Sequence, residues 1–397
     1  MVLETNQRSA SMRKLVPRLN YSFGFKDFVF SIYGVAGIRP NILSINAQFA
    51  SDRVYFVNHA RTGIRLLLNS LSLPDKAKIG VQVFNCHTVF DAIRRAGYDP
   101  VFIDVDNDLR IAIDDLEKKK KSIDALILTH TFGIPADVES VKRIITDKPI
   151  IEDCAHAFLT RYDGLMVGKF GAAAVYSIGK GKFPSIGPGG FIVINNKAMI
   201  PSFEKRYLQL LQPRGKDEII NIFKNIALTI LHNPLIYKYF TNKIVRSLNN
   251  KKDINGHYNH NEKKMLKGNL FLFWKRQPYF EQHLKRQLAN QSDILKIVYH
   301  GKASPVYNNP HISTNGFMLP ILHDNAEQII KSAKAYGIEL GRHFSESINW
   351  AKQFGYSLGK CPNAESIVKR IIVLPCHYKY SKKSVDAIIK MADEIIN

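Results

Sequence analysis

The chain has 397 residues, of which 45% are hydrophobic and 23% charged, and this length and composition exclude a fibrous or broadly disordered protein. They are typical of a globular chain with two or more domains and substantial cores. The 56 Lys and Arg against 34 Asp and Glu give a net charge of +22, which favours polyanionic partners, yet no helix-turn-helix, zinc or RNP motif points to nucleic acid.

The amino-terminal residues, MVLETNQRSASMRKLVPRLN, lack an apolar core, so we expect no signal peptide. The segment 1–50 is aromatic and irregular in pattern. Four cysteines are spread along the chain without CxxC or metal-like spacing, and this usage suits a reducing cytoplasm. They are Cys86, Cys154, Cys361 and Cys376. We therefore expect a soluble, cytoplasmic protein.

From Tyr55 to about Asn196, apolar strands alternate with amphipathic helices. This alternation predicts an α/β fold with a mostly parallel sheet flanked by helices, in a large domain that we place at residues 1–245. The expected strands are Val81–Phe84, Val101–Val105, Ala125–Thr129, Ile150–Asp153, Ala173–Ser177 and Phe191–Asn195. The expected helices include Ile64–Leu71, Val89–Ala96 and Val138–Ile145.

The chain then becomes helical and basic. Its longest apolar stretch, Ile226–Phe240, is interrupted by a His-Asn-Pro run and is too short to span a bilayer. Residues 238–286 hold 12 Lys or Arg against three acids, a pattern typical of a solvated face and compatible with docking to a polyanion. His257 and His260 lie in this stretch, where we expect a solvated loop rather than a metal site.

A long helix from Leu266 is expected to lead into a smaller carboxy-terminal domain, which we place within residues 246–397. Its expected strands are Phe317–Leu322 and Ile371–Leu374, and its expected helices are Ala326–Ala335 and Ser384–Ile395. This alternation predicts a second α/β unit.

A lysine set among small residues follows one of the strands, in the run YSIGKGKFPSIGPGG from Tyr176 to Gly190, and the strand Ile150–Asp153 ends in an acidic pair. Pyridoxal phosphate (PLP) needs an amine that holds it as a Schiff base and a carboxylate that keeps its ring nitrogen protonated. Lys182 and Asp153 are the candidates, because ligands in an open α/β sheet gather at the carboxyl ends of the strands. Taken alone, each residue is better explained in another way, Lys182 as one of many surface lysines and Asp153 as a helix cap.

Segments in the same order and spacing resemble the DegT/DnrJ/StrS family of PLP-dependent sugar aminotransferases, which have the type I aminotransferase fold. They are AlaArgThrGly at Ala60–Gly63, VQVFNCHTVFDAIRRAG followed by PVFIDVD, LILTHTFGIPADVES at Leu126–Ser140, IIEDCAHAF at Ile150–Phe158, Ser177 and Lys182 ahead of Gly189-Gly190, and CPNAESIVKRIIVLPCHYKYSKKSVDAII at Cys361–Ile389. The resemblance implies the PLP-dependent transferase type I fold, with a large sheet domain and a smaller carboxy-terminal α/β domain.

The resemblance also implies roles for the strand-end residues. Lys182 would hold the cofactor and shuttle protons, and Asp153 would pair with the pyridine nitrogen. His156 falls where the family has Gln or His beside the phenolic oxygen of the cofactor. Lys180 is a rival for the cofactor link, but its distance from Ser177 does not match the family spacing.

The phosphate of the cofactor is the second group for which the resemblance implies partners. Arg61 and Thr62 fall in the phosphate-binding turn, where backbone N–H groups at a helix start would cradle an anion. Ser177 would add a hydroxyl. No metal site is expected.

Two positions depart from the family pattern. Cys86 stands where many members have an aromatic ring stacked on the cofactor, and His87 follows it; His87 either replaces that stacking or only bonds a strand-end carbonyl. The family's Asn-x-Arg-Met segment, which reaches the neighbouring subunit's active site, has only Asn261–Met265 as a counterpart, with Lys264 in place of the arginine.

The resemblance implies an aminotransferase that converts a keto group of a nucleotide-linked sugar to an amine in a ping-pong cycle, with glutamate as donor. It further implies a homodimer and a place in polysaccharide or amino-sugar biosynthesis. Three alternatives stay open: a sugar dehydratase of the same fold, a cofactor-binding protein without turnover, and an enzyme that acts on a lipid-linked sugar and docks on the membrane through Ile226–Arg286. Relatives that dehydrate carry histidine in place of the lysine, so Lys182 argues against the first.

Overall fold

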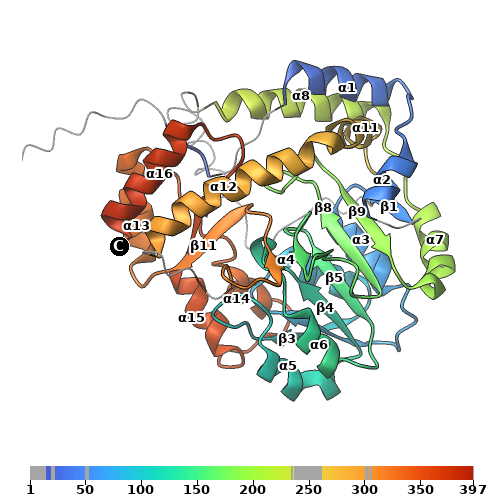
Figure 1. The fold of residues 1–397 in the computed structure, drawn as a ribbon. Helices are drawn as coiled ribbons and strands as arrows, with labels where there is room; N and C mark the ends of the chain where they lie inside the picture. The colour runs from blue at the N-terminus through green and yellow to red at the C-terminus, as the bar shows by residue number, and fades with distance from the viewer. Residues whose placement is uncertain are drawn as a thin grey trace, which may run out of the picture.

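A seven-stranded sheet forms the centre of the molecule (Figure 1). The computed structural model describes residues 15–18, 23–49, 53–233, 236, 262–299, 304 and 306–396. The strand order is β1-β9-β8-β5-β4-β2-β3, and β9 alone in this sheet runs antiparallel to its neighbours. The strands are β1 (Val54–Val57), β2 (Lys78–Gln82), β3 (Asp99–Ile103), β4 (Ala125–Thr129), β5 (Ile150–Cys154), β8 (Ala173–Ser177) and β9 (Gly190–Ile194). The expected α/β fold with a mostly parallel sheet is confirmed.

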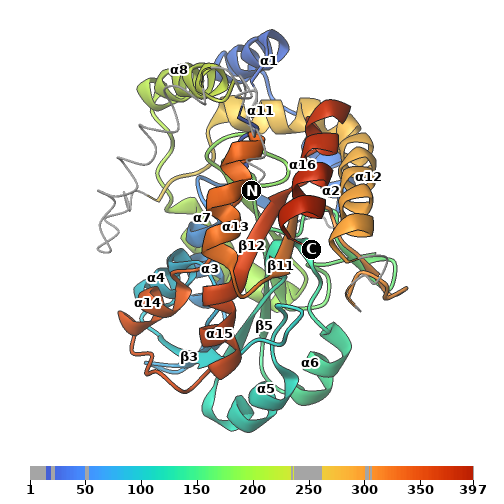
Figure 2. The ribbon, with the colours of Figure 1, turned by 90° about the vertical axis from the view of Figure 1, so that its left-hand side faces the viewer.

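Helices cover both faces of this sheet (Figure 2). They are α3 (Ala60–Leu68), α4 (His87–Arg95) and α7 (Ile200–Leu208), and α5 (Ile113–Lys119) and α6 (Val138–Ile144). Side chains alternate across a strand, so Ile127 of β4 joins the core with α3 and α4, whereas Leu126 and Leu128 join the core with α5 and α6. Because the sheet is buried on both faces, its strands appear in the sequence as continuous apolar runs.

The carboxy-terminal part forms a smaller α/β unit with its own core. Its strands β11 (Met318–Leu322) and β12 (Ile371–Pro375) pair antiparallel. The helices are α12 (Phe280–Val298), α13 (Ala326–Ala333), α14 (Ser347–Lys352), α15 (Pro362–Arg370) and α16 (Lys382–Ile395), and a small sheet joins β10 (Ile312–Ser313), β6 (Arg161–Tyr162) and β7 (Leu165–Met166). The proposed division at residue 245 falls outside the described residues, and Val16 bridges to Ile338 of this unit.

The segment 1–50, expected to be irregular, contains two helices, α1 (Phe25–Val35) and α2 (Ile42–Gln48). Helix α1 lies beside α8 (Gly215–Leu231) and packs on α11 (Lys267–Arg276) at the top of Figure 1. We call these three helices the α1/α8 layer. A Cβ at Gly34 would lie 2.5 Å from the carbonyl oxygen of Lys267, so only glycine allows α1 and α11 to approach this closely.

Candidate active site

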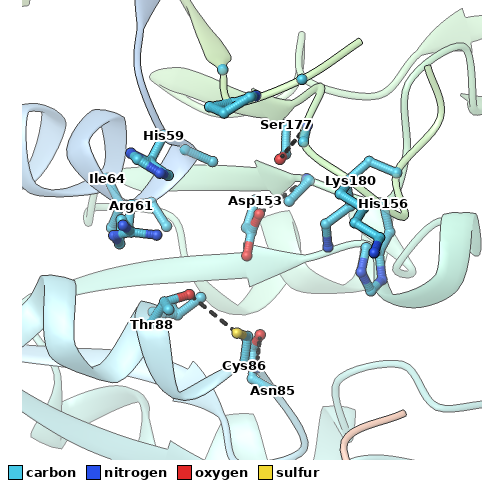
Figure 3. Close-up of a pocket in the computed structure, with 18 of the residues that line it drawn as sticks. His59, Arg61, Ile64, Asn85, Cys86, Thr88, Asp153, His156, Ser177 and Lys180 are labelled. Carbon is cyan, nitrogen blue, oxygen red and sulfur yellow. Dashed lines mark hydrogen bonds between the residues drawn. The ribbon is translucent and has the colours of Figure 1, made fainter. Parts of the chain in front are cut away.

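A cavity of about 380 Å³ lies at the carboxyl ends of β4, β5 and β8. Its other walls come from the amino-terminal ends of α3 and α4, the glycine turn 187–189 and one face of α8. In Figure 3, Asp153 lies between Ser177 and Cys86, with Arg61 at one end and His156 at the other. The cavity therefore stands where an open α/β sheet binds its ligands.

Asp153 and Lys182 both line this cavity. Asp153 is the last residue but one of β5, with only 3% of its surface exposed, and one of its oxygens accepts a hydrogen bond from the backbone N–H of Ala155 at 3.1 Å. Burial raises the pKa of Asp153, while the Ala155 bond and the charge of Lys182 oppose that rise. Burial lowers the pKa of Lys182, against the opposing charges of Cys86 and Asp153. An amine that is easily deprotonated thus shares the cavity with a buried carboxyl group.

Lys180 lines the same cavity but differs from Lys182 in its surroundings. The charge of Lys182 acts on Asp153 and on His156, whose pKa values it lowers. The charge of Lys180 acts instead on His232, at the end of α8. Lys182 is therefore the lysine that faces the strand-end groups.

Glu152, the neighbour of Asp153, points away from the cavity and is fully buried. Its carboxylate accepts backbone N–H bonds from Gly168 at 2.7 Å, Phe170 at 2.7 Å and Gly171 at 2.6 Å, and it contacts His130 Nε2 at 3.0 Å. Ligand atoms of Glu152, His130 and Cys154 lie within 4.8 Å of one another, as a metal site requires. Because the carboxylate of Glu152 already accepts these N–H bonds, we interpret the cluster as structural rather than as a metal site.

The amino terminus of α3 supplies the candidate anion site. Ala60 and Arg61 line the cavity, and a Cβ at Gly190 would lie 2.8 Å from the Ala60 nitrogen, so glycine lets the helix start close to β9. Ser177 lines the cavity as well. Thr62 does not: its hydroxyl donates to Asn58 Oδ1 at 3.0 Å, away from the cavity lining.

His156 is a buried, neutral imidazole in the cavity wall. Burial first, and then the charges of Lys182 and His343, hold its pKa well below the ordinary value. Its Nδ1 accepts the backbone N–H of Phe132 at 3.2 Å, which leaves the ring proton on Nε2. The ring also stacks on Phe344, with centroids 5.5 Å apart. His156 can therefore donate one hydrogen bond without carrying charge.

Cys86 lines the cavity and His87 does not. The His87 ring packs on Trp350, with centroids 5.0 Å apart, so it offers no stacking surface to a ligand in the cavity. Burial raises the pKa of Cys86, but His87, Thr88 and Lys182 outweigh burial and bring it down to about 7. The Cys86 sulfur lies 3.1 Å from Thr88 Oγ1.

Lys263 and Lys264 belong to the segment that corresponds to the family's partner-subunit segment, and both contact residues of their own chain. Asn261 and the preceding residues 238–260 are outside the described part. Lys264 Nζ lies 5.0 Å from the centroid of the Tyr207 ring, and its backbone N–H donates to Leu211 at 2.9 Å. Lys263 pairs with Asp217 at 2.7 Å. These two lysines of the basic stretch are thus held by neighbours in the same chain.

Helix α8 brings residues to the cavity that the sequence pattern did not indicate: Lys224, Asn225 and Leu228. They lie one and four positions apart, a spacing that puts them on one side of a helix. Asn85 and Phe344 were missed as well. Among the described residues, no helix is long and apolar enough to cross a membrane.

Known proteins resemble this chain in sequence and in fold. The GDP-perosamine synthase of Escherichia coli O157:H7 is 29% identical over 147 residues, which span 36% of this chain and 40% of the synthase. The sugar aminotransferase CalS13 of Micromonospora echinospora shares the fold with a TM-score of 0.73 at 16% identity, covering 96% of this chain and 100% of that one. Helicobacter pylori PseC, an aminotransferase of pseudoaminic acid biosynthesis, gives a TM-score of 0.74 at 16% identity, covering 96% and 98%.

The model of the DegT/DnrJ/EryC1/StrS aminotransferase family matches residues 47–217 and 270–392. These ranges contain the whole central sheet, Lys182, Asp153 and most of the smaller unit. Residues 218–269, which include most of α8, lie between the two matched ranges. With the strand-end residues and the match in agreement, the chain belongs to the DegT/DnrJ/EryC1/StrS aminotransferase family.

Proposed function

We propose that this protein is a PLP-dependent aminotransferase that converts a keto group of a nucleotide-linked sugar to an amine. The observation that carries the proposal is the meeting of Lys182 and Asp153 in one cavity at the amino terminus of α3. An amine, a buried carboxyl group, a helix start and a hydroxyl are the donor set that suits PLP. One relative is named for GDP-perosamine, and this name supports a nucleotide-linked acceptor.

The roles of the residues follow from their surroundings. Bound PLP supplies a carbonyl that exchanges amines and a ring that withdraws electrons. Lys182 would hold the cofactor through its amine and would move protons, and burial favours the neutral amine that this role needs. Asp153 would hold the proton on the ring nitrogen, and His156 would donate a hydrogen bond from Nε2. The N–H groups at Ala60 and Arg61, with the Ser177 hydroxyl, would bind the phosphate.

We propose glutamate as the amino donor and a homodimer in the cytoplasm as the working form. Helix α8 exposes Ile220, Phe223 and Ile230, apolar side chains that suit contact with a second subunit. The pathway would be polysaccharide or amino-sugar biosynthesis. Lys182 in the cavity disfavours the dehydratase alternative.

The test is incubation of the cofactor-loaded protein with glutamate and a panel of keto-sugar nucleotides, followed by mass spectrometry of the sugar product. The expected result is replacement of the keto oxygen by an amino group in at least one substrate, with equal formation of 2-oxoglutarate. Lys182→Ala is the control and should give neither product. Binding of PLP without conversion of any sugar in the panel would favour the cofactor-binding protein instead.

A further inference from the structure

Two parts of the chain that the family model does not match meet in one layer. Residues up to 46 supply α1, and residues 218–269 supply most of α8 and the start of α11. Figure 1 shows α1 and α8 side by side above α11. The α1/α8 layer therefore lies largely outside the residues that the family model matches.

The layer is held together by specific contacts at several points. The carboxylate of Glu218 caps the start of α11, accepting the backbone N–H groups of Lys267 at 2.6 Å and Gly268 at 3.2 Å. The backbone N–H of Phe23, just before α1, donates to Thr229 Oγ1 at 2.7 Å. A helix end capped by a buried carboxylate is fixed in position, because charged acceptors make strong bonds to N–H donors.

A chain of buried amides connects α8 to the turn that follows Lys182. Asn221 Nδ2 donates to Asn269 Oδ1 at 2.8 Å, and Asn269 Nδ2 donates to the carbonyl oxygen of Pro188 at 2.9 Å. Pro188 lies in the glycine turn that lines the cavity. The position of α8 is thus set relative to the residues at the bottom of the cavity.

The face of α8 toward the cavity carries one cation. Of the described residues that line the cavity, Arg61, Lys180, Lys182 and Lys224 are Lys or Arg, and Asp153 alone is Asp or Glu. Lys182 and Asp153 are assigned to the cofactor ring and the backbone N–H of Arg61 to the cofactor phosphate, whereas the charge of Lys180 acts on His232. Lys224 lies on α8, lines the cavity and has an exposed side chain.

We propose that α8 forms the acceptor subsite of this enzyme and that Lys224 binds the phosphate groups of a nucleoside-diphosphate-linked sugar. The inference rests on the proposed function and names the residue that selects its substrate. The groups assigned to the cofactor lie in the matched part of the chain. The wall formed by α8 lies largely outside that part and borders the same cavity. Half-buried Leu228, one turn along, offers an apolar contact beside the cation.

The test is the affinity of the cofactor-loaded protein for UDP, GDP and dTDP, measured by titration calorimetry, in Lys224→Ala, Lys224→Arg and the control Lys216→Ala. Lys216 lies in the first turn of the same helix, exposed and outside the cavity lining. Loss of a charged hydrogen bond should weaken binding of the best nucleotide by roughly tenfold or more in Lys224→Ala. Lys224→Arg should keep most of the affinity, and Lys216→Ala should match the parent.

A kinetic readout separates a binding role from a structural one. With an active keto-sugar nucleotide, Lys224→Ala should raise the KM for that acceptor by a similar factor while kcat changes little. Equal affinities in Lys224→Ala and Lys216→Ala would overturn the subsite, as would an equal rise in the KM for glutamate. If nucleotide binding depends on Lys224 but no sugar is aminated, the subsite stands and the proposed function fails.

Discussion

The floor of the cavity, formed by the carboxyl ends of β4, β5 and β8, differs from the α1/α8 layer above it in how side chains are presented to the cavity. The floor presents single polar groups from strand ends, such as Asp153, whose backbone is fixed by neighbouring strands in a fully buried sheet. The layer presents one side of an amphipathic helix, and its cation, Lys224, stays in contact with water. The floor lies within the family match and most of α8 lies outside it.

This difference separates two tasks. Groups that do chemistry need shifted pKa values and fixed positions, which the buried sheet provides. Groups that select a substrate need reach and charge, which an exposed helix provides, and a helix can be changed without disturbing the sheet. We therefore expect floor variants to change the rate of chemistry and layer variants to change the KM of the acceptor.

The largest effect is expected for Lys182→Ala, which removes both the amine that links the cofactor and the proton carrier. Amine exchange should fall by roughly 10⁴-fold or more. Lys180→Ala is the matched control and should retain most of the rate. Borohydride reduction and peptide mapping should place the pyridoxyl group on residue 182; a label on Lys180 would reverse the assignment of the two lysines.

Asp153→Asn should slow turnover by on the order of 10³-fold, because the ring nitrogen loses the charge that keeps it protonated. Burial raises the pKa of Asp153 above its value in the unfolded chain, so the cofactor-free protein loses stability as the pH rises through that pKa. Asparagine carries no such charge. Cofactor-free Asp153→Asn should therefore melt at a higher temperature than the parent at neutral pH, and at the same temperature in acid where both side chains are neutral.

Glu152→Gln tests the buried carboxylate that lies next to Asp153 and points away from the cavity. Because Glu152 accepts three backbone N–H bonds in a buried site, losing its charge should lower the free energy of unfolding by about 3 kcal/mol. At a temperature where the variant stays folded, the cofactor should still bind and kcat should change by less than tenfold. Chemical denaturation measures the first effect. A variant of unchanged stability that loses turnover like Asp153→Asn would give Glu152 the catalytic role.

The sequence predicted the floor more closely than the layer. Strand β8 runs over Ala173–Ser177 as expected, and β5 differs from the expected Ile150–Asp153 by one residue. Both strands are buried on two faces, so their limits coincide with the limits of apolar runs. The strand expected at Val81–Phe84 ends earlier, at Gln82, because the apolar run continues into the turn before α4.

Side-chain direction was harder to predict than position in the chain. Thr62 and His87 neighbour residues that line the cavity, yet both point elsewhere, because successive helix residues are rotated by about 100° and the helix start sets the phase. Helix α1 lies where the sequence indicated only an irregular segment. The contribution of α8 depends on contacts such as Asn221 with Asn269, 48 residues apart, which no local pattern encodes.

The smallest effect is expected where the layer joins the floor. Asn221→Ala removes the amide bond from α8 to Asn269 and leaves the bond from Asn269 to Pro188 in place. Loss of one buried hydrogen bond, worth about 1 kcal/mol, should raise the acceptor KM by roughly fivefold through a less well-fixed Lys224. The single-turnover reaction with glutamate, followed by cofactor absorbance, should keep the parent rate.

Asn269→Ala is the paired variant: it removes both hydrogen bonds, frees the turn after Lys182 and should slow the glutamate reaction as well. If Asn221→Ala slows that reaction to the same extent, α8 supports the floor directly, and the separation of chemistry from selection does not hold.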